Sequence, residues 1–326
     1  MSFVVPSFLR RTVAVVLLVG IVAAVETLAA GPPAKAENVV IITVDGLRPD
    51  ALKHAKVPNL ESLIKRGAST MKAQTVTPSL TLPAHTSMLT GLTVEQHGVD
   101  WNDYEPQRGY LKSPTVIELA SFYGRKWAAV FLNKQKLLHL AKPDLRMDLT
   151  ACSIDEPGCN AKKIASDVIA YYKHVARDPK PSLFIIHLAD ADLAGHAKGW
   201  MSKSYLQAVE ACDRAIGTIL KGFQELGLYE QTTFIVTADH GGHDMTHGTS
   251  SPEDMTIPWI VAGPGIKPGY EIKRSVSLLD TPATIMQALG LKDYYVEWSS
   301  RSVDEIFEER AAPTAIPSAG TDTPNQ

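Results

Sequence analysis

The sequence predicts an α/β fold with a mainly parallel sheet and helices on both of its faces. The 326-residue chain contains five short apolar runs rich in β-branched residues. Near-continuous apolar strands are what a sheet buried on both faces requires. Helical stretches separate these runs, and alternation of strands and helices is typical of a parallel sheet. The chain shows no internal repeat.

The apolar runs themselves are the expected strands. The first, NVVIITVD, ends at Asp45, and the fourth, TTFIVTAD, ends at Asp239. The five runs cover residues 38–45, 127–132, 182–188, 232–239 and 257–263.

Helix start and stop signals lie between the runs. The segment VPNLESLIKRG closes at Gly67. In SPTVIELASFYG we expect Ser113 as the N-cap, Pro114 in the first turn and Gly124 after the last turn. The segment LDTPATIMQALG repeats this pattern over residues 280–290.

The N-terminal segment has the pattern of a signal peptide, residues 1–36. Arg10 and Arg11 precede the apolar run TVAVVLLVGIVAAV, and small residues follow it. Cleavage is expected after Ala30 or after Ala36. An uncleaved anchor is the alternative, although the run is shorter than the ~20 residues that a span needs. We therefore expect a periplasmic or secreted protein with no transmembrane domain after signal removal.

The rest of the chain divides into one globular domain, residues 37–310, and a tail. Residues 311–326 are rich in Pro, Ala and Thr without periodicity, which predicts a disordered tail. The formal net charge of −3 offers no broad basic surface, so binding to a nucleic-acid polymer is not expected. A small charged substrate remains compatible with this composition.

The three cysteines suit an oxidising compartment. Cys152 and Cys159 bracket the turn-rich SIDEPG and can close a short disulfide loop, with two free thiols as the alternative. Cys212 lies in the helical pattern AVEACDRAIGTIL and is expected to be a small buried residue. No zinc-finger pattern of Cys and His is present.

Acidic residues follow the expected strands where ligand sites of α/β sheets form. Asp45 ends the first run, Asp190 and Asp192 follow the third, and Asp239 with His240 ends the fourth. A single such Asp is readily explained as a helix cap or turn former. Several buried carboxylates at one sheet edge would instead repel one another, and divalent metal ions remove that penalty.

Histidines accompany these acids. DLAGH ends at His196, and DHGGHDMTHG contains His240, His243 and His247. Imidazole together with carboxylate is a common ligand set for zinc and similar ions. We expect His243 to lie outside the ligand set.

A threonine precedes a helix in TPSLTLPAHTSMLTG. Thr81 lies just ahead of Pro83, and Gly91 ends the expected helix. A hydroxyl there lies at the positive end of the helix dipole, which favours a negative oxygen or phosphate. The alternative is that Thr81 only caps the helix.

Together these motifs resemble the alkaline phosphatase superfamily, and more closely its type I phosphodiesterase/nucleotide pyrophosphatase branch. The pieces, in the family's order, are VDGLRPD at Asp45, TLPAH at Thr81, GLTVEQHGVDWN ending at Asn102, DADLAGH at Asp192 and His196, and ADHGGHDMTHG at Asp239, His240 and His247. The resemblance spans nearly the whole mature chain and implies an alkaline-phosphatase-like sheet.

The resemblance also implies a metal-dependent phosphoester hydrolase that acts through a phosphothreonine intermediate on Thr81. It implies two divalent metal ions, zinc or alternatively manganese, and a small phosphate-ester substrate. Asn102 corresponds to the family's side-chain donor to a phosphoryl oxygen. The implied ligands are Asp45, Thr81, Asp239 and His240 for one ion, and Asp192, His196 and His247 for the other.

Departures from relatives leave other functions open. The C/S-x-P-x-R motif of sulfatases is absent around Thr81. Lys134 and Lys136, in FLNKQKLLHL, partly resemble the phosphate-binding cations of alkaline phosphomonoesterases, which form the runner-up class; two solvated lysines are the simpler interpretation. A non-catalytic metal-stabilised binding protein and a cofactor-independent phosphomutase are the remaining alternatives.

Overall fold

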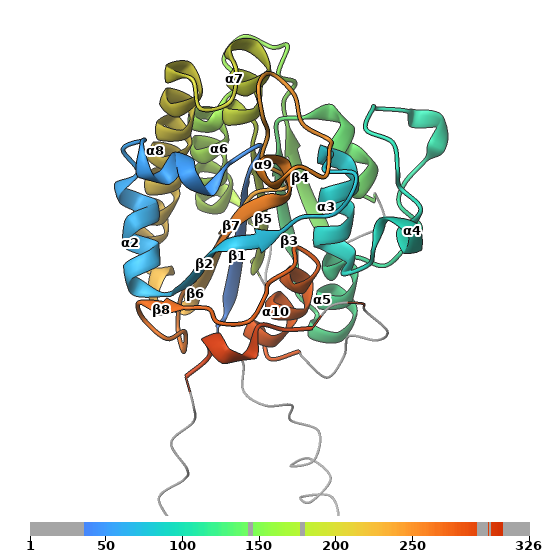
Figure 1. Cartoon of the computed structure of the whole chain (residues 1–326). Helices are drawn as coiled ribbons and strands as arrows, with labels where there is room; N and C mark the ends of the chain where they lie inside the picture. Colours follow the sequence, from blue (N-terminus) through green and yellow to red (C-terminus); the bar gives the residue numbers. More distant parts are fainter. Residues whose placement is uncertain (1–35, 143–145, 177–179, 292–298, 300, 309–326) are drawn as a thin grey trace, which may run out of the picture.

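The computed structural model describes residues 36–142, 146–176, 180–291, 299 and 301–308 (Figure 1). Within these residues one eight-stranded sheet has the order β4-β3-β5-β1-β6-β7-β2-β8. The strands are β1 (Asn38–Val44), β2 (Ala68–Gln74), β3 (Ala128–Leu132), β4 (Met147–Ala151), β5 (Leu183–Leu188), β6 (Thr232–Thr237), β7 (Thr256–Ala262) and β8 (Tyr270–Glu271).

The sheet is mainly parallel, as predicted. β1 pairs in parallel with β5 and β6, and β3 pairs in parallel with β4 and β5. β7 runs antiparallel to both β6 and β2. All five predicted strands are present. The sequence patterns missed β2, β4 and β8, because their sequences carry polar or half-exposed residues in place of a continuous apolar run.

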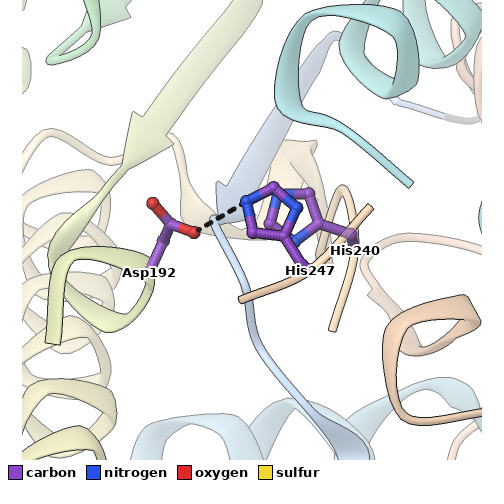
Figure 2. A group of neighbouring side chains, drawn as sticks. All are labelled: Asp192, His240 and His247. Atoms are coloured by element: carbon purple, nitrogen blue, oxygen red, sulfur yellow. Dashed lines mark ion pairs between the residues drawn. The ribbon is translucent and has the colours of Figure 1, made fainter. Parts of the chain in front are cut away.

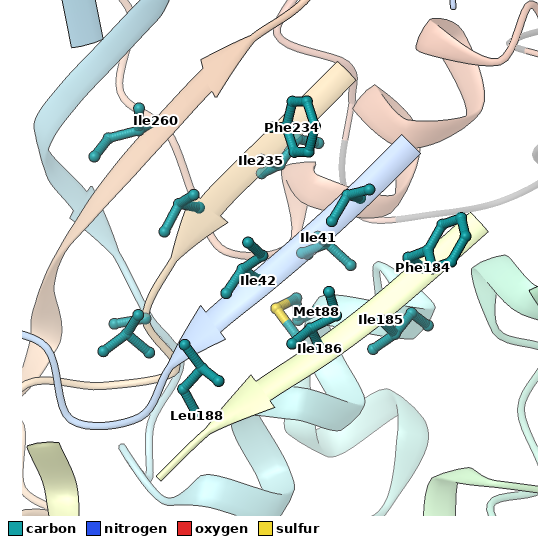
Figure 3. Close-up of a cluster of buried hydrophobic side chains, with 14 of the residues drawn as sticks. Ile41, Ile42, Met88, Phe184, Ile185, Ile186, Leu188, Phe234, Ile235 and Ile260 are labelled. Atoms are coloured by element: carbon teal, nitrogen blue, oxygen red, sulfur yellow. The ribbon is translucent and has the colours of Figure 1, made fainter. Parts of the chain in front are cut away.

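The core lies on both faces of the central strands. All seven residues of β1 are buried, as are all six of β5 and of β6. The register sets Ile41 beside Ile185 on one side and Ile235 on the other. Figure 3 shows these side chains in rows across the strands, with Met88 from a covering helix packed among them. The apolar sequence of β1 is therefore explained by burial on both faces.

Helices cover both faces of the sheet (Figure 1). One layer contains α2, α6 and α8, with α8 packed against both α2 and α6, and the other contains α3, α5 and α10. The helices are α2 (Pro58–Arg66), α3 (Thr81–Thr90), α4 (Val94–His97), α5 (Val116–Gly124), α6 (Ala161–His174), α7 (Asp190–Lys198), α8 (Lys203–Glu225), α9 (Pro252–Met255) and α10 (Asp280–Ala288).

The predicted ends of α5 are wrong by a few residues. Thr115, rather than Ser113, is the N-cap, and its backbone N–H donates to Oε2 of Glu118 at 2.6 Å, as in a capping box. Gly124 is the last helical residue, and Arg125 takes the left-handed conformation after it, with φ 50°. The capping-box glutamate was the sequence signal that identifies the correct start.

Gly67 ends α2 as predicted, but it does not adopt a left-handed conformation there. Its backbone is extended, with φ −143°. A Cβ at this position would lie 1.9 Å from the carbonyl oxygen of Val261 in β7. Glycine is needed here because two backbone segments approach closely.

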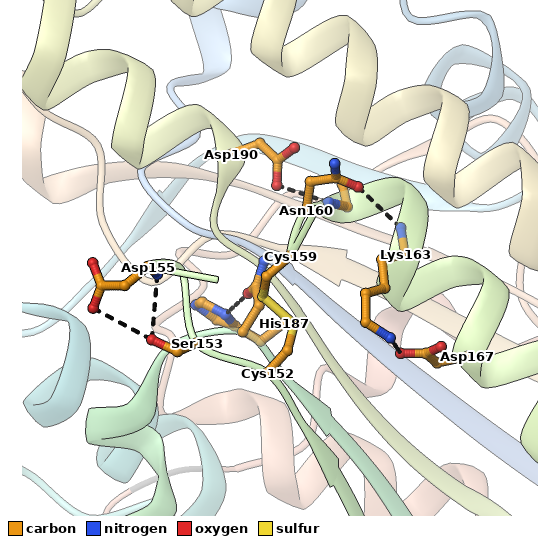
Figure 4. The surroundings of a disulfide bond; sticks show 11 residues. Cys152, Ser153, Asp155, Cys159, Asn160, Lys163, Asp167, His187 and Asp190 are labelled. Atoms are coloured by element: carbon orange, nitrogen blue, oxygen red, sulfur yellow. Dashed lines mark hydrogen bonds and ion pairs between the residues drawn. A yellow bond between two sulfur atoms is a disulfide. The ribbon is translucent and has the colours of Figure 1, made fainter. Parts of the chain in front are cut away.

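The predicted disulfide between Cys152 and Cys159 is present (Figure 4). It closes the loop between β4 and α6, where the Asn160 side chain caps α6 by accepting from the backbone N–H of Lys163 at 3.0 Å. Cys212 is buried in α8, as expected.

The predicted signal peptide and tail lie outside the described residues, apart from Ala36. Ala36 is buried, and its N–H donates to the carbonyl oxygen of Ala288 at 3.0 Å. Among the described residues, no helix has the length and apolar character that crossing a membrane demands.

Candidate active site

The predicted acidic residues and histidines meet at the carboxyl-terminal edge of the central strands. Asp45 follows β1, Asp192 lies in the first turn of α7 after β5, and Asp239 with His240 follows β6. The parallel pairing of Val44 with Leu188 and of Thr43 with Thr237 places these strand ends side by side. All four residues are at most 1 % exposed. The parallel strand pairing predicted from the sequence therefore brings these four side chains together.

A first group of potential metal ligands contains Asp45, Asp239 and His240. One ligand atom from each lies within 4.8 Å of the others. His240 Nε2 lies 3.4 Å from Oδ1 of Asp45 and 3.4 Å from Oδ2 of Asp239. The same nitrogen is 3.4 Å from Oγ1 of Thr81. The four residues expected around one ion thus converge on a single point.

A second group contains Asp192, His240 and His247, again within 4.8 Å (Figure 2). His247 Nε2 is 3.6 Å from Oδ1 of Asp192, and the rings of His240 and His247 stack with centroids 3.6 Å apart. His196 lies at the edge of this group, with its Nε2 3.4 Å from the same Asp192 oxygen and 44 % of its side chain exposed. His240 therefore lies between the two groups.

Three buried carboxylate oxygens of the site are suited to bind metal ions. In the described part of the chain, Oδ1 of Asp45, Oδ1 of Asp192 and Oδ2 of Asp239 are buried without a hydrogen-bond partner. These are the same oxygens that face the histidine nitrogens. A buried, unpaired carboxylate oxygen is costly, and one divalent cation in each group would satisfy all three oxygens.

The protonation of the site suits metal binding. Burial lowers the pKa of His240, and burial followed by repulsion from His240 lowers the pKa of His247 to about 4. Both rings are therefore neutral near pH 7, which is the ligand form of imidazole. Burial, and then the charge of Asp45, raises the pKa of Asp239 well above its ordinary value. The carboxylates of Asp45 and Asp239 repel each other, and a bound cation would relieve this repulsion.

The sequence analysis missed two residues behind Asp45: His187, which contacts Asp45, and Asn133, which contacts His187. His187 Nε2 is 2.9 Å from Oδ2 of Asp45, and His187 Nδ1 is 2.7 Å from Oδ1 of Asn133. His187 lies within an apolar β5 run, so the pattern of a buried strand concealed it. The available signal was a single histidine near the end of an otherwise apolar strand.

The sequence analysis also missed Trp200, which packs against the histidines of the second group. The Trp200 indole lies edge-on to His196, with ring centroids 5.1 Å apart, and its Nε1 donates to Gly46 O at 2.9 Å. Gly46 takes a left-handed turn directly after Asp45, with φ 71°. A Cβ on Gly195 would lie 2.7 Å from the same indole. Small residues thus let Trp200 fill the space beneath the second group.

Thr81 starts α3 but does not cap it. Leu80 is the N-cap position, and no side chain there makes a capping bond. The backbone carbonyl oxygen of Thr81 is 2.8 Å from His85 Nδ1. The Thr81 hydroxyl lies toward His240. Asn102 Oδ1 accepts from the backbone N–H of Leu82 at 2.9 Å.

The two predicted lysines lie differently. Lys134 Nζ is 2.6 Å from Oδ2 of Asp45 and 2.6 Å from Oδ2 of Asp192, so it is buried among the acids. Lys136 is partly buried and lines the cavity in front of the site. That cavity has a volume of about 520 Å³ and is lined by Leu80, Thr81, Asn102, Tyr104, Lys134, Gln135, Lys136, Ser153, Ile154, Asp155, Asp192, Leu193, His196 and His247.

Two other candidates have structural partners. Asp190 Oδ2 accepts from the backbone N–H of Ala161 at 2.9 Å, at the start of α6. His243 lies outside both groups, as expected, and its Nδ1 is 2.7 Å from Oδ1 of Asp254.

The sheet order and the clustered acids define a chain with the alkaline-phosphatase-like fold. Residues 39–256 match the profile of the type I phosphodiesterase/nucleotide pyrophosphatase family. The chain belongs to this family.

Curated relatives of known organism support the assignment. The chain is 23% identical over 214 residues to mouse ectonucleotide pyrophosphatase/phosphodiesterase family member 3, covering 62% of this chain and 24% of the relative. It is 25% identical over 229 residues to a bovine bis(5'-adenosyl)-triphosphatase, covering 65% and 48%. The chain thus spans about a quarter to half the length of these relatives.

A solved structure supports the fold. Murine ectonucleotide pyrophosphatase/phosphodiesterase 5, determined in complex with AMP, matches with a TM-score of 0.67 at 14% identity, covering 81% of this chain and 97% of that chain.

Proposed function

We propose that this chain is an exported hydrolase of small phosphodiesters or pyrophosphates, with Thr81 as its nucleophile. The observation that carries the proposal is the place of the Thr81 hydroxyl. It lies 3.4 Å from His240 Nε2, beside the first ligand group, and it lines the cavity. It makes no capping bond that would explain its position otherwise.

The two groups and the family match support the ligand sets that we propose. Asp45, Thr81, Asp239 and His240 would hold one divalent ion. Asp192, His196 and His247 would hold the other, as we infer from their shared contacts at Asp192 Oδ1. Nitrogen and oxygen donors of this kind suit zinc, with manganese as the alternative. Bound there, the two ions would lower the pKa of the Thr81 hydroxyl and stabilise charge on the leaving oxygen.

The protein groups supply position. Thr81 at the N-terminus of α3 lies where the helix dipole favours the negative charge of an attacking oxygen and of a phosphate. Asn102 uses its Oδ1 on the Leu82 N–H. Its amide N–H groups therefore remain available to donate to a non-bridging phosphoryl oxygen.

The proposed reaction has two displacements at phosphorus. Thr81 Oγ1 loses its proton and bonds to phosphorus while the bond to the leaving oxygen breaks; the leaving group departs with a proton, and the phosphothreonine keeps the second ester group of the substrate. Water then attacks the same phosphorus, gives a proton back to Thr81 Oγ1 as the bond to threonine breaks, and leaves a phosphate monoester as product. The second step restores the hydroxyl for another turnover.

An alkaline phosphomonoesterase is the second candidate. The observation in its favour is the presence of Lys134 and Lys136 in the cavity wall, because added positive charge suits the dianionic phosphate of a monoester.

The test compares a diester with a monoester on purified mature protein. We expect hydrolysis of bis-p-nitrophenyl phosphate to exceed that of p-nitrophenyl phosphate, to stop with chelator and to return with zinc. Thr81→Ala should lower kcat by at least about a thousandfold. Thr86→Ala is the matched control, since this buried hydroxyl of the same helix donates only to the Leu82 carbonyl oxygen. Full activity in the Thr81→Ala protein would refute the nucleophile.

Export is part of the proposal, and one backbone contact favours the first of the two expected cleavage positions over the second. Ala36 is buried and its N–H bonds to Ala288 O at the end of α10. Cleavage after Ala30 keeps this contact, whereas cleavage after Ala36 removes it. N-terminal sequencing of periplasmic or secreted material should therefore begin at Gly31. A chain that retains residues 1–36 in the membrane fraction would contradict export by cleavage.

A further inference from the structure

A row of three buried side chains leads from β3 to the first ligand group. Asn133 follows β3, His187 lies in β5, and Asp45 follows β1. His187 Nε2 is 2.9 Å from Oδ2 of Asp45, and its Nδ1 is 2.7 Å from Oδ1 of Asn133. All three residues are at most 1 % exposed, and His187 belongs to the surroundings of the Cys152–Cys159 disulfide (Figure 4). The hydrogen bonds of this row must therefore be satisfied within the protein, without bulk solvent.

The charge of Asp45 decides which ring nitrogen of His187 donates. Lys134 Nζ lies 2.6 Å from the same Oδ2 of Asp45, and an ammonium at this distance keeps the acid ionised. An ionised carboxylate only accepts hydrogen bonds, so His187 Nε2 must be the donor. A second proton on the ring would place another buried positive charge beside Lys134, which burial and repulsion disfavour. His187 is thus the neutral tautomer with a proton on Nε2 and an acceptor at Nδ1.

The side-chain amide of Asn133 has two orientations that fill the same space and exchange Oδ1 with Nδ2. With Oδ1 toward His187 Nδ1, two acceptors face each other at 2.7 Å, and the buried Nδ2 has no hydrogen-bond partner among the described residues. A half-turn of the amide removes this repulsion, because Nδ2 then donates to Nδ1. The ring of His187 therefore requires the second orientation.

We propose that Asn133 and His187 are positioning residues for Asp45: the Asn133 amide donates to His187 Nδ1 and so fixes the neutral ring that donates from Nε2 to the carboxylate. Oδ2 of Asp45 is then occupied by His187 and Lys134. The buried Oδ1, which has no hydrogen-bond partner, is held toward His240 in the first ligand group.

The neutrality of the ring matters for a cation in that group. A neutral donor leaves the negative charge of Asp45 to the cation, whereas an imidazolium on the same carboxylate would repel it. This role in metal binding rests on the function proposed above. The direction of the two hydrogen bonds does not, because it follows from the buried side chains alone.

Nitrogen NMR of metal-free protein tests the direction of the hydrogen bonds. With nitrogen-15 histidine, in chelator and near neutral pH, we expect the His187 ring to have one protonated nitrogen, Nε2. Its signals are assigned by their loss in His187→Gln. A proton on Nδ1, or on both nitrogens, would overturn the proposal. Asn133→Asp offers only acceptors and should bring a proton to Nδ1, so an unchanged ring spectrum in this variant would also overturn it.

The second arm measures zinc affinity by competition with a chromophoric chelator, on variants shown to be folded by thermal unfolding. The amide N–H of Gln can replace the Nε2–H of His187, so His187→Gln should lose less than about threefold in affinity and His187→Leu at least about tenfold. Equal affinity in His187→Leu and wild type would overturn the positioning role, as would an equal loss in both variants.

His97→Leu is the matched control for the loss of a buried histidine. Both ring nitrogens of His97 have partners, in Ser87 and the backbone N–H of Val99, and His97 lies outside both ligand groups. This variant should bind zinc as the wild type does, and a tenfold loss in it would remove the case for a specific role of His187. A wild type that binds no zinc would instead overturn the proposed function, while the NMR result would still decide the direction of the hydrogen bonds.

Discussion

Replacing Asp239 by Asn should stabilise the protein without metal and weaken it with metal. Oδ2 of Asp239 is buried and has no hydrogen-bond partner, and burial with repulsion from Asp45 raises the pKa of this acid. An unsatisfied buried polar group costs about 1–3 kcal/mol, and more when charged. Oδ1 accepts from the N–H groups of Gly46 and His240 at 3.1 and 3.0 Å, and an Asn oxygen can accept both.

The expected size follows from these values. A gain of about 2 kcal/mol corresponds to a rise in melting temperature of about 4–8 °C for a domain of this size. Zinc at a hundred times its dissociation constant should stabilise the wild type by about 2.7 kcal/mol for each site. Asp239→Asn removes one proposed ligand, so the order of the two proteins should reverse when zinc replaces chelator.

The assay is thermal unfolding of both proteins in chelator and in excess zinc. Asp254→Asn is the matched control, because both oxygens of this buried acid have partners, in His243 and Thr249. That substitution should lower the melting temperature in both conditions. A less stable Asp239→Asn protein in chelator, or an equal response of both proteins to zinc, would refute the reasoning.

Three further outcomes are expected. Asp213→Ala should lower the free energy of unfolding in urea by about 1–3 kcal/mol, because this buried α8 carboxylate accepts two backbone N–H groups in the first turn of α2; a loss below about 0.5 kcal/mol would count against it. The hydrogen bond to Asp254 raises the pKa of His243, so the stability that His243 adds relative to His243→Gln should be complete below its ordinary pKa and vanish as the pH rises through the raised value; a pH-independent difference contradicts this. Replacing Cys152 and Cys159 by Ser should raise KM more than it lowers kcat, because the loop they close lines the cavity; unchanged kinetics would show that the loop does not contact substrate.

The fold was predictable where burial imposes a simple pattern. β1 and β6 are buried on both faces, so their sequences are apolar throughout and easily recognised. β2 lies between β7 and β8 and alternates buried and exposed side chains, which a search for continuous apolar runs passes over. The antiparallel direction of β7 has no local sequence signal, because pairing depends on partners distant in the chain.

The candidate site was predictable in its residue types but less so in its detailed arrangement. Asp45 and Asp239 could be found because they end apolar strands, and the sheet edge brings such ends together. The contact of His187 with Asp45 depends on strand order, which the sequence does not state. The position of Lys134 depends on two carboxylates that follow different strands, so the sequence offered a phosphate-binding or a solvated lysine but not its place between the acids.

The spread of the candidate ligands along the chain bears on how the protein matures after synthesis. Asp45 directly follows the first described strand and His247 comes after the sixth, whereas the disulfide joins two cysteines only seven positions apart. The disulfide can form while most of the polypeptide is still unfolded, because so few residues separate its partners. A complete ligand set exists only when β1, β5 and β6 have joined. Uptake of the proposed metal ions should therefore be a late event of biogenesis, limited to chains whose central strands are already assembled.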